Sequence, residues 1–254
     1  LLMQILLANA KIMYEKAERE PLSTPLFQPV ADILAAEMAR MEVEELARQL
    51  DCNPKIAATN RARYRNFPAA EKMPAILAYN GQAYKHLRAD TLSGEALEYA
   101  QNHLWITCFL YGLLRPLDGI VPYRMEHCVT LEATQDKPVN QFWKDKLTQV
   151  LIDSIQADDG ILIHLSTEEY EHLFDWKRVC REVQVVHPLF YVRQKDGGLK
   201  MQAVWAKSCR GAMTRFILNN RPVTPQELAA FSYEGFEYAP QLGEEGFPHF
   251  IREI

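Results

Sequence analysis

The sequence predicts an α/β (α+β) fold in which a mixed β-sheet is flanked by helices. Short apolar runs typical of buried strands alternate with segments whose apolar residues recur at helical spacing, and one strong β-hairpin pattern lies in the second half of the chain. The chain has 254 residues, of which 48% are hydrophobic, so it can bury a substantial core. We therefore expect a single compact domain over residues 1–254.

The N-terminal half is predicted to begin with a buried strand at residues 4–8, followed after a proline-rich loop by one or two helices between 30 and 50. Residues 75–79 form a continuous apolar run that ends at an Asn-Gly turn signal, which is typical of a buried strand. Ser93 is a candidate N-cap. The apolar spacing after Ser93 predicts one helix that continues to Leu113.

The next segments are predicted as a short strand near 127–131, a helix around 140–157 and the strand of GILIHLS, which begins at Gly160. A further helix is expected at STEEYEHLF. Ser166 followed three residues later by Glu169 is the pattern of a capping box, which explains the acidic residues there without catalysis.

The strongest local signal is a β-hairpin formed by residues 182–193 and 199–206 around Asp-Gly-Gly. We expect a helix from about 207 to 219 to follow it. A short helix should come next, because Thr224, Pro225 and Glu227 suit its N-cap, N1 and N3 positions.

Composition excludes several classes of protein. No apolar window is long enough to span a membrane, and the first residues do not resemble a secretory signal. The five cysteines are dispersed and contain no C-x-x-C pair, which suits a reducing cytoplasm and predicts neither disulfides nor a metal site. No nucleophile elbow, phosphate loop or dinucleotide fingerprint occurs, so whether the protein is an enzyme stays open, and no cofactor is expected.

The charge distribution is uneven although the net charge is −5. Residues 55–88 contain seven Lys/Arg and one acid, and residues 200–221 contain five Lys/Arg and no acid. Such segregation fits a positive cleft on an acidic body that attracts an anionic partner, and it equally fits two solvated helix faces.

The segment KSCRGAMTRF at 207–216 is the first candidate binding site. If a helix begins there, Lys207 and Arg210 oppose the helix dipole, unless an anion is bound by these cations, Ser208 and the free amides. Gly211 would then allow close backbone approach. The alternative is that both cations extend into solvent.

The second candidate is the helix-hairpin-helix-like element over residues 43–67. Two helices are predicted around a tight break, with Asp51 or Asn53 as cap and Pro54 in the first turn of the second helix. Its basic residues could contact a nucleic-acid backbone. Because the break contains no glycine, an ordinary corner between two helices explains the pattern equally well.

The third candidate is the stretch LYGLLRPLDGIVPYR at 110–124. Glycine and proline suffice for a rigid corner, but a corner does not require the pocket-like set Tyr111, Arg115, Asp118, Tyr123 and Arg124. Arginine forks bind anions and aromatic faces stack on planar ligands. Arg115 could instead pair with Asp118 and brace the turn.

Four segments resemble the bacterial YaaA family of peroxide-stress proteins in order and spacing. They are LYGLLRPLDGIVPYRME from residue 110, QFWKD at 141–145, HLSTEEY at 164–170 and KSCRGAMTRFILNNR at 207–221. The resemblance implies a cytoplasmic protein that limits unincorporated iron under hydrogen peroxide and binds DNA through a positive cleft and a helix-hairpin-helix-like element. It supports Tyr111, Gly112, Arg115, Pro116, Asp118, Tyr123 and Arg124 as one motif, and Lys207, Arg210, Gly211 and Arg215 as another.

The chain departs from the family pattern in three segments. Ala8 and Asn9 replace a Ser-Pro pair before the retained Ala-Lys, Gln82 replaces an acid, and Cys108-Phe109 replaces a Ser-Gly pair before the LYG block. If the lost hydroxyl or carboxylate takes part in catalysis, this chain is an altered member of the family.

We therefore expect a DNA-binding protein of the peroxide response, with sequence-nonspecific contacts to duplex or distorted DNA and no membrane partner. The rival hypothesis is an enzyme that acts on a nucleotide or on a damaged base, with Asp118 or Glu126 as acid or base. A third hypothesis, direct iron sequestration, is disfavoured because the sequence shows no cluster of His, Cys and carboxylate ligands. The residues expected to bind phosphate are Lys11, Lys55, Arg61, Arg63, Arg65, Lys207, Ser208, Arg210 and Arg215.

Overall fold

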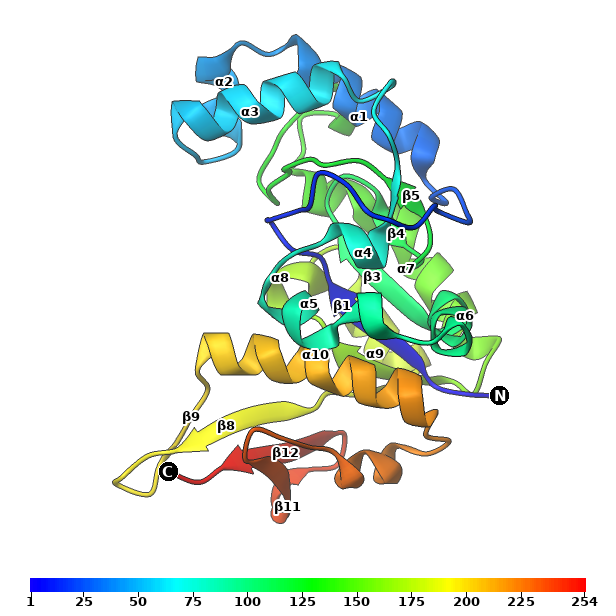
Figure 1. The fold of residues 1–254 in the computed structure, drawn as a ribbon, viewed down its shortest axis with the longest axis vertical. Coiled ribbons are helices and arrows are strands. Elements are labelled where there is room, and N and C mark those ends of the chain that lie inside the picture. The colour runs from blue at the N-terminus through cyan, green and yellow to red at the C-terminus, as the bar shows by residue number, and fades with distance from the viewer.

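A computed structural model describes residues 1–254, and it has the predicted α/β character. A mixed five-stranded sheet crosses the middle of the molecule in the order β4-β3-β1-β6-β7 (Figure 1). β1 pairs in parallel with β3 and with β6, β6 pairs in parallel with β7, and β4 is antiparallel to β3. The strands are β1 (Gln4–Ala8), β3 (Leu104–Cys108), β4 (Gly112–Leu114), β6 (Ile161–Leu165) and β7 (Gln184–Val186).

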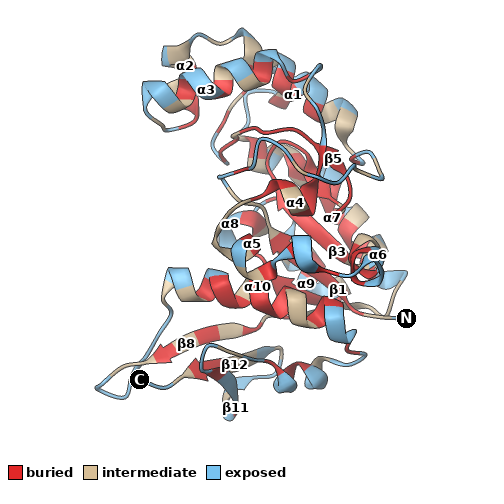
Figure 2. Cartoon of the chain, in the orientation of Figure 1, coloured by how far each residue is buried: buried red, intermediate tan, exposed pale blue.

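The inner strands β1, β3 and β6 are almost wholly buried (Figure 2). Burial of both faces explains why their sequences are continuous apolar runs rather than alternating ones. The helices around this sheet are α4 (Ala75–Ala78), α5 (Gln82–Leu87), α6 (Gly94–His103), α7 (Val139–Gln156), α8 (Glu168–Glu171) and α9 (Trp176–Glu182), with the 3₁₀ turns η1 (Ala89–Thr91) and η2 (Glu132–Thr134).

A group of three helices forms one end of the molecule, at the top of Figure 1. They are α1 (Gln28–Arg40), α2 (Val43–Gln49) and α3 (Pro54–Arg65). Asn53 caps α3 as predicted, because its side chain accepts a hydrogen bond from the Ile56 amide at 2.9 Å. The break between α2 and α3 is therefore correctly located, whereas its use as a helix-hairpin-helix remains a prediction.

A second five-stranded sheet forms the other end, in the order β10-β11-β12-β8-β9. The helix α10 (Ala203–Asn220) lies between this sheet and α5 (Figure 1). The strands are β8 (Leu189–Arg193), β9 (Leu199–Lys200), β10 (Ser232–Tyr233), β11 (Phe236–Glu244) and β12 (Phe247–Arg252), and η3 (Pro225–Ala230) precedes β10. A two-stranded ribbon of β2 (Met73–Pro74) and β5 (Gly119–Ile120) completes the fold.

Two predictions in the first half are wrong. Residues 75–78 form the helix α4 instead of a strand, and the Ala75 and Ile76 amides donate to the carbonyls of Asp118 and Pro116. The helix predicted to reach Leu113 ends at His103, and the chain continues directly into β3. Periodicity does not separate a short buried strand from a short buried helix, so both errors have the same origin.

Three predictions in the second half are also wrong in part. Residues 127–131 form no strand, and only Thr130 makes an isolated bridge. The hairpin is confirmed for β8 and β9, but residues 203–206 already belong to α10, which therefore starts four residues before the predicted position. Ser166 does not cap α8, whose N-cap is Thr167. The capping box at Thr224 and Glu227 is confirmed.

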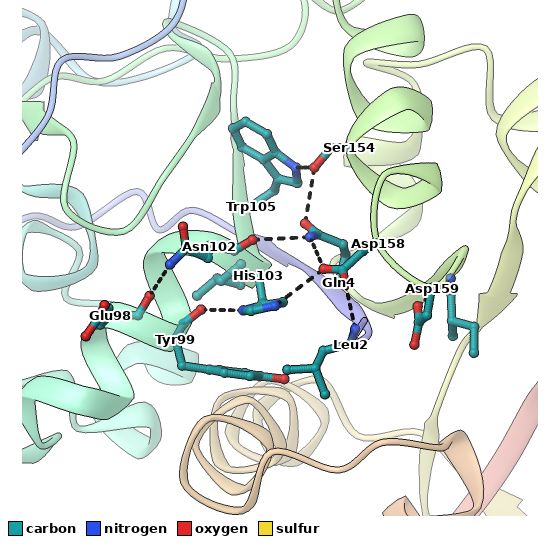
Figure 3. Close-up of polar contacts among 12 residues, drawn as sticks. Leu2, Gln4, Glu98, Tyr99, Asn102, His103, Trp105, Ser154, Asp158 and Asp159 are labelled. Atoms are coloured by element: carbon teal, nitrogen blue, oxygen red, sulfur yellow. Dashed lines mark hydrogen bonds and ion pairs between the residues drawn. The ribbon is translucent and has the colours of Figure 1, made fainter.

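A buried polar network closes the amino-terminal edge of the central sheet (Figure 3). The Gln4 amide donates to Asp158 Oδ2 at 2.9 Å, and Ser154 Oγ donates to Gln4 Oε1 at 3.2 Å. Trp105 Nε1 donates to the same serine at 3.0 Å, and His103 pairs with Asp158 at 3.4 Å. These bonds satisfy the buried polar groups and fix β1 against β3 and α7. No helix of the protein has the length and apolar character needed to cross a membrane.

Candidate functional site

A cleft of about 310 Å³ lies at the carboxyl ends of β1 and β6. These two strands are neighbours in the sheet. After β1 the next strand of the sheet, β3, lies on one side of this pair, and after β6 the next strand, β7, lies on the other side. In open α/β sheets, such a reversal creates the crevice in which ligands usually bind. The start of α5 and one side of α10 complete the walls. The polar residues of the lining are Asn9, Lys11, Gln82, Tyr84, Thr167, Glu169, Tyr170, Lys207 and Arg210.

Lys207 and Arg210 bring positive charge to this cleft from successive turns of α10. Neither side chain makes an ion pair or a hydrogen bond within the protein. Burial lowers the pKa of Arg210 below its ordinary value, since a guanidinium loses hydration there. Arg210 is therefore a partly desolvated cation that pairs with no acid of the protein.

The prediction that these cations lie in the first turn of a helix is wrong, because α10 begins at Ala203. Lys207 and Arg210 are the fifth and eighth residues of the helix, so its free amides do not assist them. Ser208 is buried, and its hydroxyl donates to the Val204 carbonyl at 2.9 Å. The amides at the start of α10 therefore do not contribute to anion binding in the cleft, and this helix offers only its side chains.

The cleft wall at β1 is connected to a cluster of buried tyrosines. The Asn9 amide donates to the hydroxyl of Tyr123 at 3.0 Å, and the Tyr170 hydroxyl donates to Asn9 Oδ1. Tyr123 also exchanges a hydrogen bond of 2.7 Å with Tyr79. Burial raises the pKa of Tyr123 well above its ordinary value, so it stays a neutral phenol. Tyr123, predicted to line a pocket, thus lies behind the lining and orients Asn9.

Gln82, where the family pattern has an acid, joins α5 to α10 at the edge of the cleft. Its amide donates to Ser208 Oγ at 2.9 Å and lies 3.1 Å from His86 Nε2. Lys11 enters from the loop after β1 and pairs with Glu126 Oε2 at 3.0 Å. Glu126 is only 6% exposed and is also paired with Arg124 Nε at 3.1 Å. Glu126 is therefore the one predicted carboxylate beside the cleft, and its charge is balanced by Lys11 and Arg124.

The 110–124 corner does not bring its other polar groups to the cleft. Arg115 extends to the opposite edge of the sheet, where it donates to the Leu104 carbonyl at 3.1 Å and to Ser154 Oγ at 3.2 Å. Its guanidinium lies 3.5 Å from the centre of the Trp105 ring, and burial lowers its pKa to about 10. Arg115 thus completes the network of Figure 3, in which Trp105 and Ser154 are labelled.

Asp118 and Tyr111 are buried within the corner itself. Asp118 accepts hydrogen bonds of 2.7 Å from the Arg115 amide and from the Ser23 hydroxyl. The brace between Asp118 and Arg115 is therefore made by the backbone and not by the guanidinium. Tyr111 is 1% exposed, and its hydroxyl accepts a hydrogen bond from the Val121 amide at 3.3 Å.

The other predicted phosphate-binding residues are distributed over the surface. On α3, Arg61 pairs with Glu42 at 2.6 Å and Arg63 pairs with Glu15, whereas Lys55 and Arg65 make no ion pair. Arg215 of α10 donates to the carbonyls at the end of α5, at 2.9–3.0 Å. α3 and α10 lie in different layers of the molecule, so one compact site does not include both (Figure 1).

The family of the chain follows from comparison with known proteins. A family model described as "Peroxide stress protein YaaA" matches residues 3–242. The chain belongs to this family. A UPF0246 protein of Bacteroides thetaiotaomicron is 44% identical over 247 residues, which is 96% of each chain. UPF0246 proteins of Porphyromonas gingivalis and Legionella pneumophila are 41% and 33% identical, and the matches cover 91% and 98% of this chain and 91% and 99% of those proteins.

Within this YaaA-family protein, Lys11, Lys207 and Arg210, three of the predicted phosphate-binding residues, line the same cleft, and their binding of phosphate stays a prediction. Asn9, Gln82 and Tyr170 were not predicted as site residues, although they line the same cleft. Two of these three are positions where the chain departs from the family pattern. The sequence signal for Asn9 and Gln82 was that each differs from the residue expected in the family pattern.

Proposed function

We propose that this protein acts in the cytoplasm during peroxide stress by binding DNA, with backbone phosphates held in the cleft between β1, β6 and α10. Lys207 and Arg210 supply unpaired positive charge, and Lys11, which pairs with Glu126, lines the same cleft. The observation that carries this proposal is the absence of any internal partner for Lys207 and Arg210, although Arg210 is partly desolvated. Phosphate groups satisfy such cations and release counterions from the DNA.

The shape of the molecule supports contact with an extended polymer. The α2–α3 unit at one end and the β8–β9 hairpin at the other both extend to the left of the middle layer in Figure 1, where α5 and α8 lie. Lys55 and Arg65 of α3 remain without ion pairs and are available for further phosphates outside the cleft. In this proposal DNA binding protects against iron-dependent damage, as the family resemblance implies.

The test is the salt dependence of binding to a labelled duplex, measured by fluorescence anisotropy for the wild type and for Lys207→Ala/Arg210→Ala. Each phosphate contact contributes about 0.9 to the slope of log affinity against log salt, so the double variant should lose about 1.8. Lys137→Ala/Lys177→Ala removes the same charge outside the cleft and is the control. Equal slopes for the two double variants, or affinity independent of salt, refute the proposal.

A second candidate function is favoured by the location of the cleft at a topological switch point. Its volume of about 310 Å³ suits one small ligand better than a duplex. A nucleotide or a flipped base could enter it, and Glu126 is the predicted acid or base that lies next to Lys11. Release of free base from damaged-base oligonucleotides, abolished by Glu126→Gln with unchanged DNA affinity, would favour the enzyme. Intact oligonucleotides would exclude glycosidic cleavage.

A further inference from the structure

Two histidines and one glutamate meet behind the cleft, at the edge of the central sheet. His164 is the fourth residue of β6, and His187 follows the last residue of β7. Because Ile163 pairs with Val186, the two histidines occupy the next position of the parallel register and project on the same face. Their ring centroids are 4.3 Å apart. Glu171, the last residue of α8, approaches them from the helix.

The potential ligand atoms of these three side chains lie within 4.8 Å of one another. Glu171 Oε1 is 2.8 Å from His164 Nε2. Metal–nitrogen and metal–oxygen bonds of about 2.0–2.2 Å place two ligands of one ion roughly 3–4 Å apart. Small side-chain rotations therefore suffice to bring all three to a shared ion.

His164 has a hydrogen-bond partner on one ring nitrogen only, and the imidazole of His187 has none. His164 is 1% exposed, and its Nδ1 has no hydrogen-bond partner. His187 makes no side-chain hydrogen bond in the structure. Imidazole nitrogens and carboxylate oxygens are the donor atoms that proteins use for such metal ions.

We propose that His164, His187 and Glu171 bind one divalent first-row transition-metal ion. Imidazole ligands select ions such as Fe²⁺, Co²⁺ and Zn²⁺, whereas Mg²⁺ and Ca²⁺ prefer an all-oxygen shell. Three protein ligands leave a fourth position for water or for an external ligand.

The composition of the site also separates it from the cleft. Leu165 and Tyr170, the neighbours in sequence of His164 and Glu171, line the cleft, whereas the three proposed ligands do not. The two proposed sites share no ligand residue, so metal binding and DNA binding can be tested separately and failure of one proposal does not refute the other.

The experiment is a titration of tag-free, chelator-treated full-length protein with Co²⁺, followed by visible absorption, and then displacement by Zn²⁺ or Fe²⁺. We expect one Co²⁺ per chain and at least about tenfold weaker binding for His187→Ala and for Glu171→Gln, since even residues outside the ligand sphere change affinity about 10–100-fold. The neighbouring His172→Ala and Glu168→Gln are matched controls and should bind like the wild type.

Two further measurements ensure a decision if a variant folds poorly. The thermal midpoint of the wild type should rise with Zn²⁺, because a ligand that binds only the folded state stabilises it. Circular dichroism without metal checks the fold of each variant. Absence of a cobalt spectrum and of the thermal shift in the wild type overturns the proposal, as does unchanged affinity in folded His187→Ala.

Discussion

The contact between α5 and α10 predicts that Gly211→Ala destabilises the protein. A Cβ at this position would lie 1.8 Å from the Ala83 carbonyl oxygen and 2.6 Å from its carbonyl carbon. Both atoms belong to the backbone of α5, so no side-chain rotation relieves the clash. The sequence suggested Gly211 for close approach of a ligand, and the structure shows that a helix makes that approach.

The expected magnitude combines two opposing terms. Alanine in place of glycine in a helix interior favours the folded state by about 1 kcal/mol. Overpacking of a rigid contact costs about 1–3 kcal/mol, and more where the neighbour cannot move. Because the clash is with backbone and is very short, we expect the upper part of this range, and a net loss of at least about 1–2 kcal/mol.

The assay is urea unfolding of the wild type, Gly211→Ala and Gly94→Ala. Gly94 is the first residue of α6, and a Cβ added there meets nothing within 4 Å. The control should therefore be unchanged or slightly more stable. If Gly211→Ala is as stable as the wild type, the two helices do not approach as closely as described, and the reasoning fails.

Two further predictions concern Asp118 and Asn53. Burial raises the pKa of Asp118, so between its ordinary and its raised pKa the folded state holds a proton that the unfolded chain has lost. The contribution of Asp118 to the free energy of unfolding is then greatest at low pH and falls as pH rises through the raised pKa. Urea unfolding should therefore show a larger stability difference between wild type and Asp118→Asn at about pH 4 than at about pH 7. The opposite trend contradicts this. Asn53→Ala removes the α3 cap and should cost about 1 kcal/mol, whereas an unchanged urea midpoint contradicts that role.

The sequence predicted those local features, such as helix caps, that a single residue type is enough to form. The caps at Asn53 and Thr224 are such cases, because a side-chain oxygen near free amides is a local arrangement. The start of α10 was missed because nothing local marks it: its N-cap, Gln202, makes no side-chain capping bond. Val204 and Trp205 also favour strands, so the pattern extended the hairpin into the helix.

The cleft could be predicted only in part, since its lining comes from four distant segments of the chain. Charge identified Lys207 and Arg210 but also Arg61 and Arg63, which pair with acids that sequence distance conceals. In the same way, His164 and His187 are separated by 23 positions and become neighbours only through the register of β6 and β7. The sequence therefore shows where basic residues occur, but only tertiary contacts determine which of them pair with acids and which remain unpaired.

The segment around Gly211 holds α10 against α5, and this contact sets the distance between the two helices that line the cleft. Gly211 allows α10 to approach α5, Arg215 binds the carbonyl groups at the end of α5, and Ser208 accepts a hydrogen bond from Gln82 at its start. α5 and α10 are thus fixed at three points along their length. Because Gln82 lines one wall and Arg210 lines the other, any change that separates the helices also separates the polar groups that would meet a ligand. Under the proposed function, Gly211→Ala should consequently weaken binding of the labelled duplex in the anisotropy assay even where the protein remains folded, and unchanged affinity of the folded variant would contradict this coupling.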